Sequence, residues 1–324
     1  MFKTTQKTLR LLILLFVLFF SIFSFMVIWF WFGIHVEKDH EPALAFWLPH
    51  EFSTGQQNSQ TLLEKFQGLP VTDLYFHVGP IEPDGTLAKD LSLSAEDLAA
   101  LPSTNYAWIG QIRSKVPLEN AAVRQKIIDS CQWLLMQGFD GIHLDIEPVR
   151  EDDSDFLLLL QEMRSALPTA SISIAMDEWQ PHGFTQLLAK HFEVPMESYW
   201  STEQVESVLP YVDQLVVMTY DTGFRDPDLY SWWVEQQTLA LSKRVGSDTE
   251  LFIGIPCYNR GTRFDPLAEN VQSSLKGYLR GVQNLRTQTE HVTGLAVYPY
   301  WEMDETEWTS LHQFFSPHET DLPE

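Results

Sequence analysis

Cysteine is scarce in this sequence, which has only Cys131 and Cys257 among its 324 residues. Two cysteines cannot form the disulfide framework that supports many small exported domains, so the fold must depend on its own hydrophobic core. We predict that Cys131 lies on a helix and Cys257 at the end of a strand, and that they do not pair. A Gly-rich phosphate-binding loop after the first predicted strand is also missing, which argues against a nucleotide-binding fold.

Basic residues are few as well. The chain has 21 Lys and Arg residues against 44 Asp and Glu residues, which gives a formal net charge of −23 at pH 7. A surface of this charge repels polyanions, so nucleic acid is not expected as a partner. No motif indicates a cofactor, and we expect neither a cofactor nor a bound metal, although one strand carries a possible set of metal ligands that is weighed below.

Charge is absent from Leu11 to Gly33, a run of 23 residues rich in Leu, Phe and Ile. This run is long enough to cross the hydrocarbon core of a bilayer, which is about 30 Å thick. Three basic residues precede it and all acidic residues follow it, so the positive-inside bias leaves the N-terminus in the cytoplasm and exports the rest. The run is longer than the apolar core of a cleavable signal peptide, the main alternative, and ends in aromatic residues that suit a membrane interface. We therefore predict an uncleaved, single-pass signal anchor.

Apolar runs typical of β-strands alternate with helical patterns along the remainder of the chain, which favours a parallel sheet. The eight runs are 43–47, 73–78, 106–112, 141–147, 171–176, 214–220, 251–256 and 294–298. Helical spacing of apolar residues follows the third and fourth runs, over 121–137 and 155–167. Eight strands alternating with helices over about 275 residues predict a closed (β/α)₈ TIM barrel.

The predicted organisation has five parts. A cytoplasmic tail covers 1–10, the transmembrane anchor 11–33, a linker 34–41, the barrel 42–316 and a flexible acidic tail 317–324. The barrel and its tail are extracytoplasmic in this scheme.

The fourth predicted strand carries the strongest chemical signal. Strand side chains alternate between two faces, so an apolar set and an ionisable set separate. The apolar set is Ile142, Leu144 and Ile146, and the ionisable set is His143, Asp145 and Glu147. The ionisable set is expected to point into the barrel, with Glu147 nearest the C-terminal rim where barrel active sites are built. A carboxylate behind Glu147 would hold it protonated near neutral pH, as a general acid requires, although a purely structural ion network is the alternative.

This strand resembles the motif Asp-Gly-x-Asp-x-Asp-x-Glu of the family 18 glycoside hydrolases, the chitinases and endo-N-acetylglucosaminidases. Further patches resemble the family at the sixth, seventh and eighth predicted strands. The matching residues are Asp140, Gly141, Asp145 and Glu147 on the fourth strand, Met218, Tyr220 and Asp221 on the sixth, 254–260 on the seventh, and Trp301 after the eighth. The resemblance extends from about residue 43 to residue 308.

The resemblance implies substrate-assisted retention, in which the 2-acetamido group of the substrate attacks the anomeric carbon. Glu147 would then be the general acid and base, and Asp145 would orient the acetamido nitrogen. Tyr220 would hydrogen-bond the acetamido oxygen, and Asp221 would help to position the acetamide. Trp301 would form an apolar floor under the reacting sugar. The implied substrate is a β-linked glycan containing N-acetylglucosamine.

His143 departs from the family motif, which usually has a second Asp there. Imidazole is neutral or cationic in the physiological range, so we expect His143 to hold Asp145 ionised in one orientation and to change the pH profile or substrate choice.

The groove also differs from that of many family members. Only about 33 residues separate the seventh and eighth predicted strands, so we expect no insertion domain there and a shallow groove. Met218, Tyr258, Trp179 and Arg260, at strand ends, are further candidates for substrate contact.

Two rival functions stay open. A catalytically silent glycan-binding protein would keep the barrel and the groove, and the His143 departure is compatible with it. A metal-dependent hydrolase would use His143, Asp145 and Glu147 as ligands from one strand face, but only His77 stands out as a further ligand.

Overall fold

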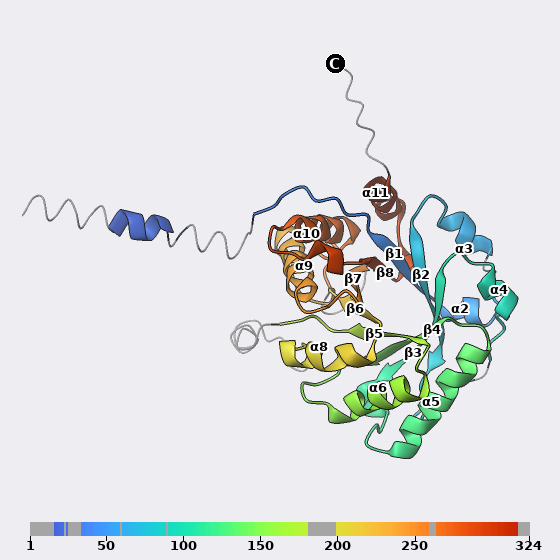
Figure 1. Ribbon diagram of the computed structural model, residues 1–324. Helices are drawn as coiled ribbons and strands as arrows, with labels where there is room; N and C mark the ends of the chain where they lie inside the picture. The colour runs from blue at the N-terminus through green and yellow to red at the C-terminus, as the bar shows by residue number, and fades with distance from the viewer. Residues whose placement is uncertain are drawn as a thin grey trace, which may run out of the picture.

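A computed structural model describes residues 16–22, 24, 34–58, 60–88, 90–180, 199–258 and 264–316. Within these residues the chain forms a closed barrel of eight parallel strands in sequence order, surrounded by helices (Figure 1). The strands are β1 (Ala43–Leu48), β2 (Val71–Pro80), β3 (Thr104–Ile112), β4 (Gly141–Glu147), β5 (Ser171–Met176), β6 (Gln214–Met218), β7 (Glu250–Pro256) and β8 (Gly294–Tyr298). The predicted (β/α)₈ barrel is confirmed.

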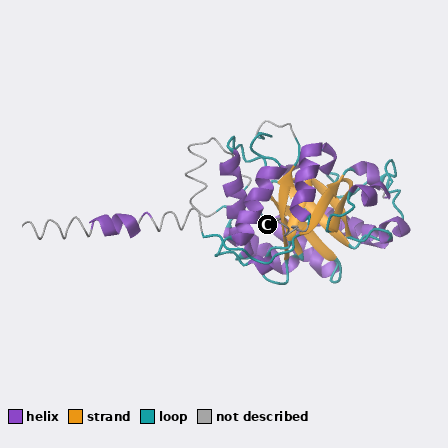
Figure 2. Cartoon of the chain, turned by 90° about the horizontal axis from the view of Figure 1, so that it is seen from above, coloured by secondary structure: helices purple, strands orange, loops and turns teal. Residues whose placement is uncertain are grey.

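The helices form the outer layer of the barrel, as Figure 2 shows from above. The α-helices are α2 (His50–Ser53), α3 (Gln60–Lys65), α4 (Ala95–Ala99), α5 (Ala121–Met136), α6 (Ser154–Ala166), α8 (Thr202–Val208), α9 (Pro227–Ser242), α10 (Val271–Gln283) and α11 (Glu305–Phe315). Short 3₁₀ turns are η1 (Arg113–Lys115), η3 (Leu209–Tyr211), η4 (Thr289–His291) and η5 (Tyr300–Glu302). Side-chain N-caps such as Asn120, Asp153 and Asp226 fix where the long helices begin.

Most of the buried hydrophobic residues belong to two cores. The larger one lies between strands and helices and includes Ile142, Leu144 and Ile146 of β4. The smaller one fills the barrel interior and includes Trp47, Tyr75, Tyr106 and Phe252. The predicted alternation on β4 is therefore confirmed, and it directs the ionisable face of this strand inward.

The predicted boundaries differ from the observed ones mainly at strand and helix ends. β2 is longer than the predicted 73–78 because its first and last residues still pair with β1 and β3. β6 ends at Met218, so Tyr220 and Asp221 lie on the loop that follows it. Both cysteines are buried and free, as predicted.

The segment between β7 and β8 contains α10 and η4 as its described helices. The helix α10 ends at Gln283, because its C-cap Asn284 leaves the helical conformation. No inserted sheet occurs in the described part of this segment.

The predicted anchor lies mostly outside the described residues, as do residues 1–10 and the acidic tail 317–324. Among the residues that the structure does describe, no helix is long and apolar enough to cross a membrane. Membrane anchoring therefore stays a prediction.

Candidate active site

A cavity of about 380 Å³ opens at the C-terminal ends of the barrel strands. Residues from β1, β3, β4, β6 and β8 and from the loops after β6, β7 and β8 line it. They are Trp47, Trp108, Asp145, Glu147, Met218, Tyr220, Asp221, Tyr258, Tyr298, Pro299 and Glu302. A second cavity of about 490 Å³ shares Trp108, Asp145, Glu147, Tyr220 and Asp221 with the first and adds Asp177 and Glu178 after β5. The two cavities thus meet at the carboxyl pair of β4.

Asp145 and Glu147 form the centre of this groove. The indole N–H of Trp108 donates to Oδ2 of Asp145 at 2.9 Å. The other oxygen, Oδ1, is buried and has no hydrogen-bond partner among the described residues. The Asp145 and Glu147 carboxyl groups lie close enough for each to influence the pKa of the other.

Burial and nearby negative charges favour a proton on Glu147. Burial and the negative charges of Asp145, Asp177 and Asp221 raise the pKa of Glu147 well above its usual value. Burial also raises the pKa of Asp145, but the hydrogen bonds from Glu147 and Trp108 oppose this change. The surroundings of Glu147 therefore favour its protonated form, which matches the requirement for a general acid.

The opposite wall of the cavity comes from the loops after β6 and β7. Asp221 has a positive φ of 60°, an uncommon conformation for a residue other than glycine. The buried Glu269 holds this turn by accepting hydrogen bonds from the backbone N–H groups of Thr222 and Gly223 at 3.2 and 3.1 Å. The rings of Tyr220 and Tyr258 meet edge to face with centroids 6.0 Å apart. Tyr220 and Asp221 thus reach the carboxyl pair from a rigid turn.

Known proteins can now be compared with this site. The family model described as "Glycosyl hydrolases family 18" matches residues 112–314. The chain belongs to this family.

Solved structures with a similar fold agree with the assignment. They include the spore cortex-lytic enzyme SleL of Bacillus cereus, with a TM-score of 0.57 and 14% identity over 87% of this chain and 76% of that one. A chitinase of Bacteroides thetaiotaomicron has a TM-score of 0.56 and 9% identity over 86% and 96% of the two chains. A fungal endo-β-N-acetylglucosaminidase of family 18 has a TM-score of 0.56 and 13% identity over 85% and 97%. At these identities the likeness shows the fold alone. No curated protein sequence matches the chain.

His143 is the residue that departs from the family 18 motif. We expected it to contact Asp145, but it does not. Its Nε2 accepts a hydrogen bond from the Trp47 indole at 3.0 Å, and its Nδ1 is 2.7 Å from the Ser173 hydroxyl. The Trp47 N–H requires an unprotonated Nε2, so the ring is the neutral Nδ1–H tautomer, and burial lowers the pKa of His143 to about 3. The expectation that His143 holds Asp145 was therefore wrong, because both nitrogens are engaged below the site.

The hydrogen bonds of His143 continue across the barrel interior. Ser173 donates to Oε1 of Gln214 at 2.6 Å, and Tyr75 donates to the same oxygen at 2.8 Å. The ring of Tyr75 also stacks on His143 with centroids 4.2 Å apart. His143 thus belongs to a layer of buried polar side chains under the active site that are hydrogen-bonded to one another.

Tyr298 occupies the place that we expected for Trp301. Tyr298 is the last residue of β8 and lines the cavity, where its ring stacks on Tyr220 at 6.0 Å. Trp301 is 39% exposed and lines neither of the two cavities. Its ring meets the ring of Tyr298 edge to face. The prediction chose the wrong aromatic residue because β8 ends three residues earlier, where its inward-facing alternation places Tyr298.

The remaining predicted residues separate into three groups. Met218 and Tyr258 line the cavity. Trp179 does not, because its ring packs under Arg244 at 4.3 Å and its indole N–H donates to Thr202. Arg260 lies outside the described residues.

Asp140 and Gly141 lie at the opposite end of β4 from the cavity. The Asp140 carboxylate accepts from the backbone N–H of Asn105 at 2.8 Å and joins β4 to β3. A Cβ on Gly141 would lie 2.6 Å from the Tyr106 ring. Both residues therefore position the strand.

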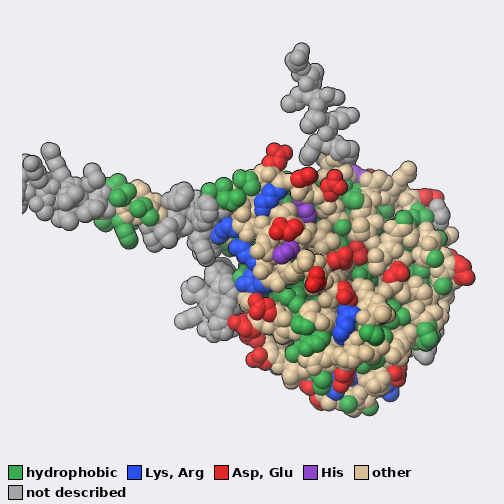
Figure 3. Space-filling view, in the orientation of Figure 1, with side chains coloured by type: hydrophobic (Ala, Val, Ile, Leu, Met, Phe, Trp, Pro, Cys, Tyr) green, Lys and Arg blue, Asp and Glu red, His purple; other side chains and the backbone are tan. Residues whose placement is uncertain are grey.

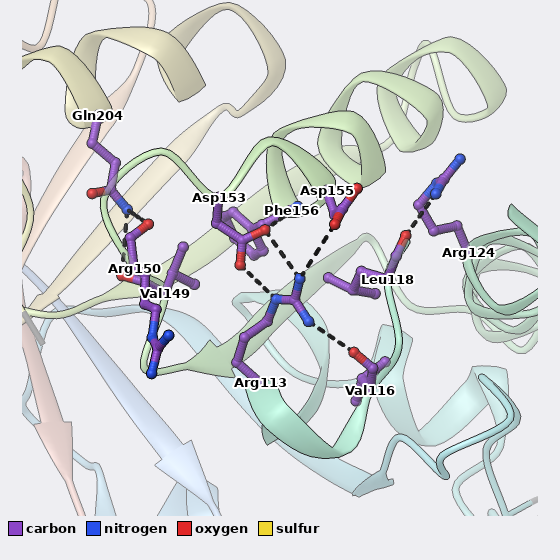
Figure 4. Close-up of polar contacts among 10 residues, drawn as sticks. All are labelled: Arg113, Val116, Leu118, Arg124, Val149, Arg150, Asp153, Asp155, Phe156 and Gln204. Atoms are coloured by element: carbon purple, nitrogen blue, oxygen red, sulfur yellow. Dashed lines mark hydrogen bonds and ion pairs between the residues drawn. The ribbon is translucent and has the colours of Figure 1, made fainter. Parts of the chain in front are cut away.

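The rim beyond Glu147 is braced by charged and polar contacts (Figure 4). Arg113 makes two hydrogen bonds to Asp153, at 2.6 and 3.0 Å, and so ties the loop after β3 to the start of α6. Gln204 donates to the carbonyl groups of Val149 and Arg150. The strand end that carries Glu147 is therefore held from both sides.

Trp47, Trp108 and Tyr298 are the site residues that sequence reasoning missed. All three lie at inward-facing positions near the C-terminal ends of predicted strands, so the alternation that selected Glu147 would have found them. Among the described residues, no group of three or more His, Cys, Asp or Glu side chains is arranged to hold a metal ion.

Proposed function

We propose that this family 18 protein is a glycosidase that cleaves a β-linked, N-acetylglucosamine-containing glycan by a substrate-assisted retaining mechanism. The observation that carries the proposal is the pair of carboxyl groups, Asp145 and Glu147, that lines the cavity, where burial and neighbouring negative charges raise the pKa of Glu147. A protein that only binds glycans has no need of a buried proton donor. The enzyme reported as an endo-β-N-acetylglucosaminidase among the similar structures agrees with this substrate class.

In the proposed first step, the acetamido oxygen of the substrate attacks the anomeric carbon while the glycosidic bond breaks. Glu147 gives its proton to the departing oxygen. Asp145, held by Trp108, accepts a hydrogen bond from the acetamido N–H and stabilises the positive charge of the cyclic intermediate. The Tyr220 hydroxyl donates to the acetamido oxygen, and Asp221 helps to position this group from the same loop.

In the second step, a water molecule attacks the anomeric carbon and displaces the acetamido oxygen from it, which regenerates the acetamido group. The carboxylate of Glu147 removes its proton, which restores the starting state and releases a sugar with retained configuration. The rings of Trp47, Trp108 and Tyr298 line the cavity and supply apolar surface for the C–H faces of the sugar.

We further propose that residues 11–33 anchor the enzyme in a membrane, with the barrel on the extracytoplasmic side. The support is the uncharged run of 23 residues and the basic residues that precede it.

Hydrolysis of N-acetylglucosamine oligomers by the full-length protein in detergent tests the activity. We expect Glu147→Gln to lower kcat at least about a hundredfold, because general acid catalysis is lost while the shape of the site is kept. Chromatography of the released oligomers gives the rate. The matched control is Glu151→Gln, which removes an exposed carboxylate just beyond β4 and should leave the rate unchanged.

Equal inactivity of the wild type and Glu147→Gln on a broad panel of such glycans, with binding retained by both, would contradict the enzymatic proposal. It would identify a glycan-binding protein instead.

A further inference from the structure

Residues 34–41, which we predicted to be a linker, begin with a stretch that is attached to the barrel. Backbone hydrogen bonds join this segment to the chain that follows α10. They run from Val36 N–H to Gln283 O at 2.8 Å and from Leu285 N–H to Ile34 O at 2.7 Å, and His35 and Asn284 form an antiparallel bridge. The attachment thus begins one residue after the end of the uncharged run.

A buried carboxylate strengthens this attachment. Glu235 of α9 is fully buried and lies 2.9 Å from Nε2 of His35 and 3.0 Å from Arg280 of α10. Asn284 donates to the same carboxylate at 2.9 Å. Lys38 adds hydrogen bonds to the carbonyl groups of Asn284 and Thr287 and to the Thr289 hydroxyl, at 2.8 to 2.9 Å. The segment is therefore part of the barrel surface and does not act as a free tether.

The attachment lies at the end of the barrel opposite the cavity. The chain segments after α9 and α10 lead into the N-terminal ends of β7 and β8. The cavity opens at the C-terminal ends of the same strands, beside Tyr258 and Tyr298. Residue 34 therefore enters the barrel at its base.

Large apolar side chains are exposed around this entry point. They are Ile34, Val36, Leu279 and Leu285, each between 38% and 51% exposed. The backbone contacts place Ile34 beside Leu285, and Val36 beside Gln283, one helical turn after Leu279. These four residues form what we call the basal apolar face.

Cations gather next to the basal apolar face. Arg286 follows Leu285 directly, and Gln288 of the same loop hydrogen-bonds to Ser242 at the end of α9, next to Lys243 and Arg244. Burial and repulsion from Arg286 and Arg244 lower the pKa of Lys243. Figure 3 shows Lys and Arg side chains along the edge where the N-terminal segment meets the barrel. Such a cluster is unusual on a chain with a net charge of −23.

We propose that the basal apolar face and its neighbouring cations dock on the anionic headgroup surface of the membrane that holds residues 11–33. This inference rests on the membrane anchor proposed above. A bilayer is the expected occupant because Ile34 directly follows the uncharged run, so the membrane surface lies beside this face as soon as the anchor is inserted. Apolar side chains at the interface and nearby Lys and Arg residues are the combination that anionic lipid surfaces attract.

Docking at the base fixes the orientation of the enzyme. The cavity opens on the far side of the barrel, so it faces away from the bilayer. The substrate is then a glycan that lies beyond the membrane surface, at about the depth of the barrel from it.

Fluorescence of the full-length protein in vesicles containing phosphatidylglycerol tests the proposal. Cysteine variants Leu279→Cys and Leu285→Cys carry an environment-sensitive dye, while Cys131 and Cys257 are buried. The control is Leu267→Cys, because Leu267 is 81% exposed on the loop after β7, near the cavity end. We expect lipids with a headgroup-level quencher to quench the two basal positions at least threefold more than position 267.

A second pair of variants tests the role of charge. Lys243→Gln and Arg286→Gln should weaken docking about fivefold for each removed cation, and vesicles of phosphatidylcholine should weaken it in the wild type. Equal quenching at positions 267, 279 and 285 would overturn docking. A dye shift at the basal positions without lipid quenching would also overturn it, because protein would then cover the face.

Alkaline extraction of the same vesicles separates this outcome from failure of the anchor. Protein that stays in the vesicles without basal quenching retains the anchor and overturns docking alone. Protein that is extracted overturns both proposals.

Discussion

Two tryptophan N–H groups organise the polar residues of β4. Trp108 donates to Asp145 in the cavity, and Trp47 donates to His143 one layer below. The first contact keeps the Asp145 carboxylate beside Glu147, and the second keeps His143 neutral. The ionisable residues of β4 therefore divide into two groups. Asp145 and Glu147 line the cavity, and the His143 imidazole is buried below them.

This separation predicts the effect of His143→Phe. The change leaves the Trp47 N–H and the Ser173 hydroxyl without their partner in a buried layer, so we expect the free energy of unfolding to fall by about 3 kcal/mol. The pH dependence of kcat/KM between pH 5 and 8 should not change, because a group with a pKa of about 3 does not titrate there. Chemical denaturation measures the free energy of unfolding, and rates of oligomer hydrolysis between pH 5 and 8 measure the pH dependence of kcat/KM.

His143→Gln is the control, since its amide offers one donor and one acceptor, and it should lose less stability. Suppose that His143→Phe shifts the pH profile of kcat/KM and leaves the free energy of unfolding unchanged. This result would show that His143 acts on Asp145 electrostatically and would contradict the prediction.

At the scale of elements, the approach of β3 to β4 sets the position of the carboxyl pair. Gly110 of β3 lies opposite Asp145 in the strand register. A Cβ at Gly110 would lie 2.3 Å from the Asp145 carbonyl oxygen and 3.1 Å from the Asp145 Cβ. Backbone atoms cannot yield at such distances, so any larger residue separates the two strands under the active site.

Gly110→Ala should therefore displace Asp145 from Glu147. We expect about 1–3 kcal/mol lower stability and at least a tenfold lower kcat, because overpacking moves the strand that carries the acid. Thermal unfolding and oligomer hydrolysis measure the two effects. Gly246→Ala is the matched control, since no atom lies within 4 Å of the added Cβ. Identical behaviour of both variants would refute this role of Gly110.

At the scale of the whole molecule, several partly or fully buried carboxyl groups bind protons more tightly than they do in water. Burial, with other causes, raises the pKa of Asp73 to about 6, of Glu269 to about 7 and of Glu307 to about 7. The folded state thus prefers their protonated forms. The negative net charge adds repulsion that grows as further carboxyl groups ionise.

These shifts predict that stability falls as the pH rises. Glu269 contributes its full stabilisation below its ordinary pKa of 4.5 and loses it as the pH approaches the folded pKa of about 7. The loss is about 1.4 kcal/mol per pH unit for each fully shifted group. Denaturation between pH 4.5 and 8 should show this slope, and Glu269→Gln should reduce it. A rise in stability over this range would contradict the assignment.

The sequence alone was sufficient for the barrel and for the central acid. Eight apolar runs of strand length between helical patterns leave few other architectures for a chain of this size. A period of two along 141–147 separates Glu147 and Asp145 from Ile146 without any tertiary information. These features depend on local geometry, which the sequence encodes directly.

Tertiary structure alone decided which side chains meet. His143 bonds to Trp47 and Ser173 on other strands, Tyr298 lines the cavity instead of Trp301, and the Arg244 side chain covers Trp179. The partner of an inward-facing side chain depends on the register of neighbouring strands and on where each strand ends, and neither follows from the pattern within one strand. The physical reason is that the sequence determines the face of each residue, whereas closure of the barrel determines its neighbours.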